Sequence, residues 1–221
     1  MLNRQKHAKM VTEINSSHNS LMDFSQVASK ERQEKTKASL EQNGFTVLLV
    51  ETGEAAKQKV LELLPDGAEV MNMTSQTLET AGIVKAIEES GRFTLTRTKL
   101  SDPTTDPRDK KRYGAAPEWV LGSIHALTED GQAMIASNTG SQLPAYVYGS
   151  DHVIWVVGAQ KIVTDLNQGH QRLEEYVLPL EDARARVAYG VPSAINNLLV
   201  MKGGSTAKRV TIILVNKKLG F

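Results

Sequence analysis

Two uncharged polar stretches carry most of the chemistry that the sequence offers. The first, "ASNTGSQLP" (136–144), follows the apolar run "AMIA" and holds hydroxyls, amides and a glycine without any charge. Such groups can donate hydrogen bonds to a carboxylate or phosphate, and a glycine lets the backbone approach a ligand closely. A plain turn needs only about two to four residues. The longer polar run therefore favours a binding loop, with a simple turn as the alternative.

The second stretch, "MTSQTLETAG" (73–82), places three hydroxyl side chains where a strand is expected to end and a helix to begin. The N–H groups at a helix N-terminus attract anions, and ligands of open α/β folds gather beyond the carboxyl ends of strands. The alternative is that Ser75 only caps the helix. Lys161 follows an apolar strand-like run and could supply charge to an anion, or pair with Asp165 four residues on.

We expect the two stretches to form neighbouring walls of one polar cleft that binds a small anion. A hydroxy acid, a keto acid or a phosphorylated metabolite would fit such donors. The predicted ligand-binding residues are Thr74, Ser75, Thr77, Asn138, Thr139, Gly140, Ser141 and Lys161. No catalytic residue is singled out, and the candidate acids or bases, which the sequence does not rank, are Glu79, His125, Asp165 and Glu181.

Three other motifs have plainer interpretations. "KGGST" (202–206) lacks the G-x-x-x-x-G-K-[ST] pattern of a phosphate-binding loop and precedes an apolar segment, so a hairpin turn is favoured. "RDKKR" (108–112) could meet an anion, but a short charged run is usually a solvated loop. The five histidines include no pair at the i, i+4 spacing of a helical metal site, so no metal and no cofactor is predicted.

Composition excludes several classes of protein. The 221 residues include no cysteine, which rules out disulfides and Cys-ligated iron–sulfur clusters or zinc on this chain. A net charge of +1 favours neither nucleic acid nor membrane surfaces. The first twenty residues lack the apolar core of a signal peptide, and the run "VIWVVGA" is too short to span a membrane. We expect a cytoplasmic protein, with homo-oligomerisation possible.

The hydrophobic pattern predicts an α/β fold with a mostly parallel sheet and flanking helices. Strands are expected at 45–51, 68–73 and 152–158, and helices from Asp23 or Ser25 to Gln42, over 53–64 and over 75–90. This alternation is typical of βαβ units. We expect a polar N-terminal extension (1–22) followed by a single domain (23–221), which could include a small lobe.

The remaining segments have other patterns. Residues 101–117 contain three prolines and a basic run, which predicts a surface loop holding one short helix at most. Residues 118–137 predict a β-hairpin about "EDG", with His125 within a strand, and 167–178 predict a helix. The end, 195–221, predicts two strands joined by the glycine-rich turn.

Four blocks in order resemble the lactate-utilisation (LUD) domain family: "DGAEVMNMTSQTLETAGI", "LTEDGQAMIASNTGSQLP", "HVIWVVGAQKIVTDL" and "LPLEDARARVAYG". The resemblance covers about Asp23 to Phe221, and the family includes the C component of the bacterial lactate-utilisation operon. It implies a fold similar to the NagB/RpiA/CoA-transferase-like group. It also implies a part in L-lactate oxidation beside iron–sulfur partner proteins, with this cysteine-free chain as the cluster-free member.

Two other functions stay open at this point. CoA-transferases of the larger fold group use a glutamate in a Ser-Glu-Asn-Gly loop as nucleophile, whereas "SNTG" (137–140) holds no carboxylate. Asn138 cannot form an acyl anhydride, so covalent CoA transfer is disfavoured unless a carboxylate comes from elsewhere. A free-standing CoA-transferase-like or sugar-phosphate-isomerase-like enzyme is one alternative, and a non-catalytic ligand-binding or scaffold protein is the other.

Overall fold

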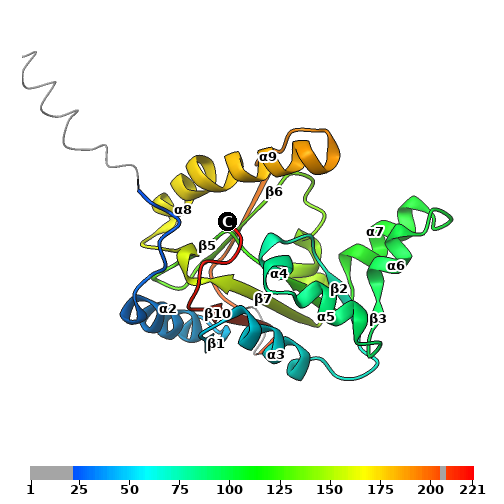
Figure 1. Ribbon diagram of the computed structural model, residues 1–221, viewed down its shortest axis with the longest axis horizontal. Helices are drawn as coiled ribbons and strands as arrows, with labels where there is room; N and C mark the ends of the chain where they lie inside the picture. Colours follow the sequence, from blue (N-terminus) through cyan, green and yellow to red (C-terminus); the bar gives the residue numbers. More distant parts are fainter. Residues whose placement is uncertain (1–21, 205–207) are drawn as a thin grey trace, which may run out of the picture.

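The computed structural model describes residues 22–204 and 208–221, which contain two β-sheets (Figure 1). The larger sheet has six strands in the order β1-β10-β7-β4-β2-β3, and every neighbouring pair is parallel. Its strands are β1 (Thr46–Val50), β2 (Glu69–Asn72), β3 (Thr94–Leu95), β4 (Trp119–Gly122), β7 (His152–Gly158) and β10 (Val210–Val215). The predicted α/β fold with a parallel sheet is confirmed.

The smaller sheet is mixed and has the order β8-β5-β6-β9. Its β5–β8 pair is parallel, while β5–β6 and β6–β9 are antiparallel. Its strands are β5 (Ala126–Thr128), β6 (Ala133–Ser137), β8 (Ile162–Val163) and β9 (Asn197–Met201). The chain leaves the larger sheet after β4 to form the β5–β6 hairpin and returns to it at β7, so the two sheets are built from interleaved segments.

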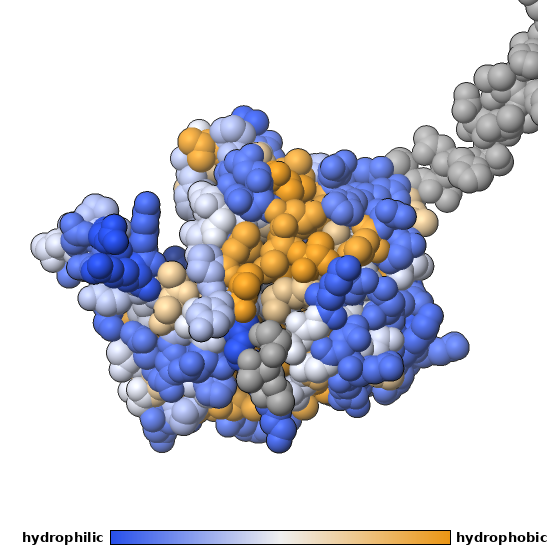
Figure 2. All heavy atoms as spheres, turned by 180° about the vertical axis from the view of Figure 1, so that it is seen from behind, coloured by the Kyte–Doolittle hydropathy of each residue, from blue (hydrophilic) through white to orange (hydrophobic). Residues whose placement is uncertain are grey.

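Helices cover the sheets and extend to one side of them (Figure 1). The α-helices are α2 (Lys30–Gln42), α3 (Gly53–Leu63), α4 (Gln76–Thr80), α5 (Ile83–Glu89), α6 (Thr96–Ser101), α7 (Pro107–Ala115), α8 (Leu166–Arg172) and α9 (Leu178–Tyr189). Shorter turns are η1 (Ala145–Gly149), η2 (Ala159–Lys161) and η3 (Leu173–Val177). We call α6 and α7 the arm, because they project from the body and their surface is strongly hydrophilic (Figure 2).

The buried side chains form three layers of core. One face of the large sheet packs against α3, α4 and α5 through residues such as Ile154, Ile213 and Val60. The opposite face packs against the small sheet and α2, with Trp155 fully buried between them. The far face of the small sheet packs against α8 and η3. Strands buried on both faces read as continuous apolar runs, which explains segments such as "HVIWVVG" and "VTIILV".

Several predicted helix boundaries are wrong. The first helix begins at Lys30 with Ser29 as its N-cap, whereas the Asp23 carboxylate accepts hydrogen bonds from Ser25 in a preceding turn. The expected helix over 75–90 is split into α4 and α5 at Gly82, which has φ of 66°. That left-handed conformation suits glycine and ends the first helix. The N-cap role of Ser75 is confirmed.

The proline-rich segment 101–117 holds one short helix, α7, as expected. The other helix of the arm, α6, lies just before this segment and was not expected. Asp106 caps α7 and Pro107 stands at its first position, where proline is compatible with a helix because no N–H is needed there. The helix expected over 167–178 begins at Leu166 and continues through η3 into α9. Of the three prolines in 101–117, Pro107 therefore marks a helix start.

Both predicted hairpins need correction. The turn at "EDG" does join β5 to β6, but Trp119–Gly122 belongs to the large sheet, and His125 lies in the connection before β5 instead of within a strand. The two C-terminal strands do not pair. β9 pairs with β6, while β10 lies between β1 and β7 in the other sheet. Residues 205–207 of the expected turn, and 1–21 of the expected N-terminal extension, lie outside the described residues.

Within the described ranges, no helix is both long and apolar enough to cross a membrane.

Candidate functional site

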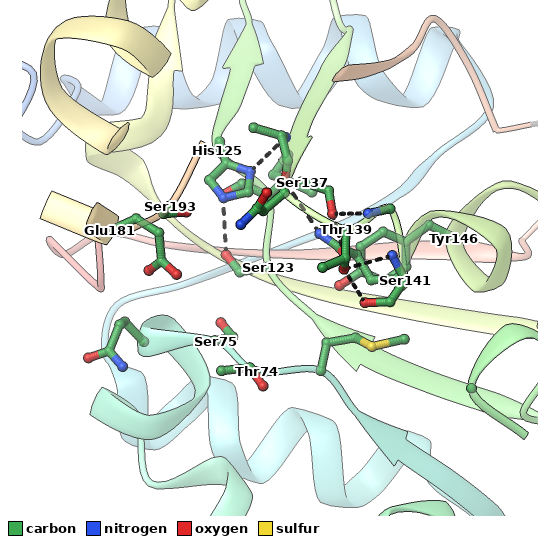
Figure 3. A pocket seen from close by; sticks show the side chains of 18 of the residues that line it. Thr74, Ser75, Ser123, His125, Ser137, Thr139, Ser141, Tyr146, Glu181 and Ser193 are labelled. Atoms are coloured by element: carbon green, nitrogen blue, oxygen red, sulfur yellow. Dashed lines mark hydrogen bonds between the residues drawn. The ribbon is translucent and has the colours of Figure 1, made fainter. Parts of the chain in front are cut away.

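A cavity of about 840 Å³ lies where three strands of the large sheet end. The segments that follow β2, β4 and β7 reach it, together with the loop after β6, the start of α9 and the arm. In Figure 3, Thr74 and Ser75 lie on one side, and Ser137, Thr139 and Ser141 on another. All eight residues predicted to bind a ligand line this cavity: Thr74, Ser75, Thr77, Asn138, Thr139, Gly140, Ser141 and Lys161. That they bind a ligand stays a prediction.

The β2–α4 segment uses part of its hydrogen-bonding capacity within the protein. The Ser75 hydroxyl accepts the Leu78 N–H at 3.3 Å, as a helix cap does. Thr74 Oγ1 accepts a hydrogen bond from Arg97 Nη2 at 2.8 Å. Thr77 is buried, and its hydroxyl bonds to the Leu219 carbonyl at 3.2 Å and to Lys161. Thr77 therefore holds the C-terminus and Lys161 in place, while Thr74 and Ser75 lie nearer to the cavity.

The loop after β6 is also partly tied together by its own side chains. The Ser137 hydroxyl accepts the Gly140 N–H at 2.8 Å and donates to Gln142 Oε1 at 2.8 Å. Gly140 has φ of 77°, a left-handed conformation that favours glycine. Thr139 Oγ1 donates to Ser141 Oγ at 3.0 Å. These bonds fix the loop, and the exposed Thr139 and Ser141 side chains stand at the edge of the cavity.

Lys161 is the buried cation of the site. It is 2% exposed, and its Nζ lies 3.0 Å from Thr77 Oγ1, 3.1 Å from Ser123 Oγ and 3.0 Å from the Ile124 carbonyl. It does not pair with Asp165, whose carboxylate caps α8 through the Gln168 N–H. Burial, and then repulsion from Arg172, lower the pKa of Lys161 to about 7. Among the described residues, no carboxylate lies within ion-pairing distance of Lys161.

A second buried cation lies behind the cavity wall. The Arg172 side chain is fully buried, donates from Nε to the His125 carbonyl at 2.9 Å and from Nη1 to the Phe24 carbonyl at 2.7 Å. Its guanidinium also lies over the Tyr176 ring, 4.9 Å from the ring centroid. The described part of the chain places no carboxylate beside it. Arg172, together with Lys161 in its protonated form, therefore makes this region electrically positive.

His125 lines the cavity as a neutral hydrogen-bond donor. Its Nδ1 accepts the Ala136 N–H at 3.1 Å, so the proton of the neutral ring must be on Nε2. Burial, followed by repulsion from Lys161 and Arg172, lowers the pKa of His125 to about 3. The imidazole is therefore uncharged at neutral pH and offers an N–H to a neighbouring acceptor.

The arm brings further positive charge to the cavity. Lys110 and Lys111 of α7 line it, so part of the "RDKKR" run, expected to be a solvated loop, faces the site. Of the described residues that line the cavity, five are Lys or Arg (Arg97, Lys110, Lys111, Lys161 and Arg184) and one, Glu181, is acidic. Glu181 is already paired with Arg184 through bonds of 2.7 and 2.6 Å.

The four candidate acids and bases separate into two groups. His125 and Glu181 line the cavity, whereas Glu79 and Asp165 do not. No motif surrounds Ser123, Arg97 and Tyr146 of the cavity wall, or Arg172 behind it, so the sequence offers no signal for them. Within the described ranges, no group of three or more His, Cys, Asp or Glu side chains is placed to hold a metal ion.

The fold and site define an α/β protein with a parallel sheet, a second mixed sheet and a cation-lined cavity at the strand ends. The LUD domain family model matches residues 33–215, so the chain belongs to this family. A crystal structure described as a DUF162 family protein from Deinococcus radiodurans is similar in fold, with a TM-score of 0.53 and 13% sequence identity over 86% of this chain and 99% of that chain. DUF162 is the older name of LUD, so the two comparisons agree. No curated protein matches the chain.

Proposed function

We propose that this LUD-domain protein takes part in organic-acid utilisation, with L-lactate oxidation as the expected setting, and binds a small anionic metabolite in the cavity. One observation carries the proposal: five Lys and Arg side chains line the cavity against one glutamate, which is itself paired. Lys161, the buried member of this set, needs a compensating negative group when it is protonated. An anionic ligand would supply that group, and the uncharged hydroxyls and amides of the two loops would orient it.

The size and lining of the cavity suit a small metabolite with both polar and apolar parts. A volume of about 840 Å³ lies in the usual range of roughly 300–1,000 Å³ for small-molecule sites. The wall includes apolar side chains such as Met73, Leu100 and Val177 beside the polar loops. A metabolite with an acidic head and a less polar remainder would fill this space better than lactate alone.

The LUD family suggests a place for the chain beside iron–sulfur partner proteins of lactate oxidation. Without cysteine the chain cannot hold such a cluster through thiolates, so it would be the cluster-free member. A relation to the NagB/RpiA/CoA-transferase-like group belongs to the same proposal. The second candidate is a free-standing enzyme, favoured by the presence of Ser123, His125 and Glu181 on the cavity wall.

The proposal is tested by thermal unfolding with L-lactate, pyruvate, sugar phosphates, CoA esters and nucleotides. A ligand present at about 100 times its Kd should stabilise the protein by about 2.7 kcal/mol and raise the unfolding midpoint. The double variant Lys110→Gln/Lys111→Gln should reduce the shift, because it removes positive charge from the cavity wall. Lys85→Gln, on the exposed side of α5 and outside the cavity, is the matched control.

Two results would count against anion binding in this cavity. One is the absence of any shift with all five classes of compound. The other is a shift that the Lys110/Lys111 variant leaves unchanged. The part in lactate oxidation is tested separately, by comparing a partner complex with and without this chain, and equal oxidation rates would contradict it.

A further inference from the structure

Ser123 and Lys161 meet at the cavity although 38 residues separate them along the chain. Ser123 directly follows β4, and Lys161 lies at the end of η2, just after β7. Since β4 and β7 are neighbours in the parallel sheet, their carboxyl ends place the Lys161 Nζ 3.1 Å from the Ser123 Oγ. Ser123 is partly exposed and lines the cavity (Figure 3).

The hydrogen bonds around Lys161 determine how an uncharged amine would be oriented. The Ile124 carbonyl can only accept, so it takes one N–H of Lys161. Thr77 donates its own hydroxyl hydrogen to the Leu219 carbonyl, so its oxygen takes the second N–H. A neutral amine has two hydrogens and one lone pair. Both hydrogens are then used, and the lone pair is directed at the Ser123 hydroxyl. That hydroxyl also lies 3.4 Å from the Ile124 carbonyl, a longer contact than the 3.1 Å to Lys161 Nζ, so the amine is the nearer acceptor for its hydrogen.

The surroundings of Lys161 favour the uncharged form near neutral pH. Its side chain is 2% exposed, and the titratable groups that face it are Arg172 and His125, with no carboxylate among the described neighbours. The cationic Arg172 opposes protonation, while His125 stays neutral. A lysine of this kind can accept a proton, as the base of a Ser–Lys pair requires.

We propose that Ser123 is a nucleophile and Lys161 is its general base, so that the cavity is a site of acyl transfer or hydrolysis. The positive lining selects esters or thioesters that carry negative charge. This inference goes beyond the proposed function, because ligand binding alone needs neither a nucleophile nor a base.

The reaction is balanced with water as the co-reactant. The Ser123 hydroxyl proton passes to Lys161 Nζ while Oγ bonds to the acyl carbon. The bond from that carbon to the leaving oxygen or sulfur breaks, and the leaving group takes the proton from the Lys161 ammonium. A water molecule then loses a proton to the neutral amine and bonds to the acyl carbon. The bond from that carbon to Ser123 Oγ breaks, Oγ takes the proton back from the Lys161 ammonium, and the acyl group leaves as an acid. The Nε2–H of His125, which lines the same cavity, supplies a donor for negative charge on the carbonyl oxygen.

The test is labelling of the full chain with a fluorophosphonate, followed by intact-mass and peptide analysis. The serine oxygen bonds to phosphorus and fluoride leaves, so the adduct marks a reactive serine. We expect one adduct, on Ser123, in the wild type and in Ser90→Ala, whose hydroxyl lies outside the cavity. Ser123→Ala should give no adduct, and Lys161→Met should be labelled at least about tenfold more slowly.

The dependence of labelling on pH separates a base from a merely structural lysine. The wild-type rate should rise through a single ionisation near pH 7, and this rise should be lost in Lys161→Met. If that variant does not fold, as judged by circular dichroism, Lys161→Arg replaces it, because arginine stays charged and cannot act as the base.

The inference is overturned if the folded wild type gives no adduct on Ser123. It is equally overturned if the lysine variant is labelled as fast as the wild type. A protein that binds anions but is not labelled would refute the Ser123–Lys161 pair and leave the proposed function standing.

Discussion

Arg172, and Lys161 whenever it is protonated, are buried cations that are held by neutral acceptors instead of carboxylates. Such a charge reduces stability unless something compensates it. Here the compensation consists of carbonyls, hydroxyls and aromatic rings, which is weaker than an ion pair. The protein therefore keeps positive potential where an anion can enter, at a cost to the stability of the unliganded fold.

His125 should make stability depend on pH in the acidic range. Its pKa is about 3 in the folded protein and 6.5 in the unfolded chain. Between pH 7 and pH 5 the His125 imidazole binds a proton in the unfolded chain but stays neutral in the folded protein. The free energy of unfolding therefore decreases as the pH falls. Relative to His125→Gln, which does not titrate, the wild-type free energy of unfolding should drop by about 1–2 kcal/mol.

This difference can be measured by urea unfolding of both proteins at pH 7 and pH 5. The other histidines and the carboxylates contribute equally to both proteins and cancel in the comparison. An identical loss of stability in wild type and variant would show that His125 takes up a proton in the folded state, and would contradict the neutral Nε2–H donor.

The sequence supported only part of the site at the residue level. Lys161 and the hydroxyls of 74–77 and 137–141 stood out because they follow strand-like runs or form a long polar stretch. Ser123 gave no such signal, since a single serine in "LGSIHAL" has no pattern around it. The contact between Ser123 and Lys161 can be inferred only when β4 and β7 are known to be neighbours.

At the level of elements, Gly122 links the large sheet to η1. A Cβ at this position would overlap the Tyr146 hydroxyl, which lies at the cavity wall. We expect Gly122→Ala to lower the free energy of unfolding by about 1–3 kcal/mol, the usual cost of overpacking. Gly114→Ala is the control, because a Cβ there meets nothing within 4 Å and alanine suits helix α7 better.

A double-variant cycle shows whether the contact with Tyr146 causes the loss. Tyr146→Phe removes the overlapping oxygen, so the double variant should be more stable than the sum of the two single effects implies. Urea unfolding of the four proteins gives this coupling energy. Simple additivity would mean that Gly122 is required for a reason other than Tyr146.

The secondary-structure pattern identified strands better than it identified their partners. "NLLVM" and "VTIILV" were correctly expected to be strands, but an alternating or continuous apolar run does not reveal which strand lies beside it. β9 joins the small sheet and β10 the centre of the large one, although fewer than ten residues separate them. Because the two strands are close along the chain, a hairpin was expected. β10 instead lies buried between β1 and β7 and does not pair with β9.

At the scale of the whole molecule, net charge concealed a local asymmetry. The chain carries 26 Lys and Arg and 25 Asp and Glu, which suggested no preference for charged partners. Yet many acidic side chains form ion pairs on exposed helices, such as Lys59–Glu62 and Lys85–Glu89, while five Lys and Arg side chains line the cavity with one glutamate. Folding brings α7, η2 and the strand ends together. The cluster of positive side chains that results cannot be predicted from the composition of the chain.

The buried amine has a consequence for the solution around the protein. An anion lodged near Lys161 would favour its ammonium form and raise its pKa above about 7. Between pH 7 and pH 8, ligand uptake should then draw a proton from the buffer. The binding heat of one ligand, measured by calorimetry in phosphate and in Tris, should differ between the two buffers because their ionisation enthalpies differ. Lys161→Met should abolish this difference. Equal binding heats for the wild type in both buffers would mean that ligand binding does not change the protonation of Lys161. The cavity would thus couple metabolite occupancy to the acidity of its surroundings.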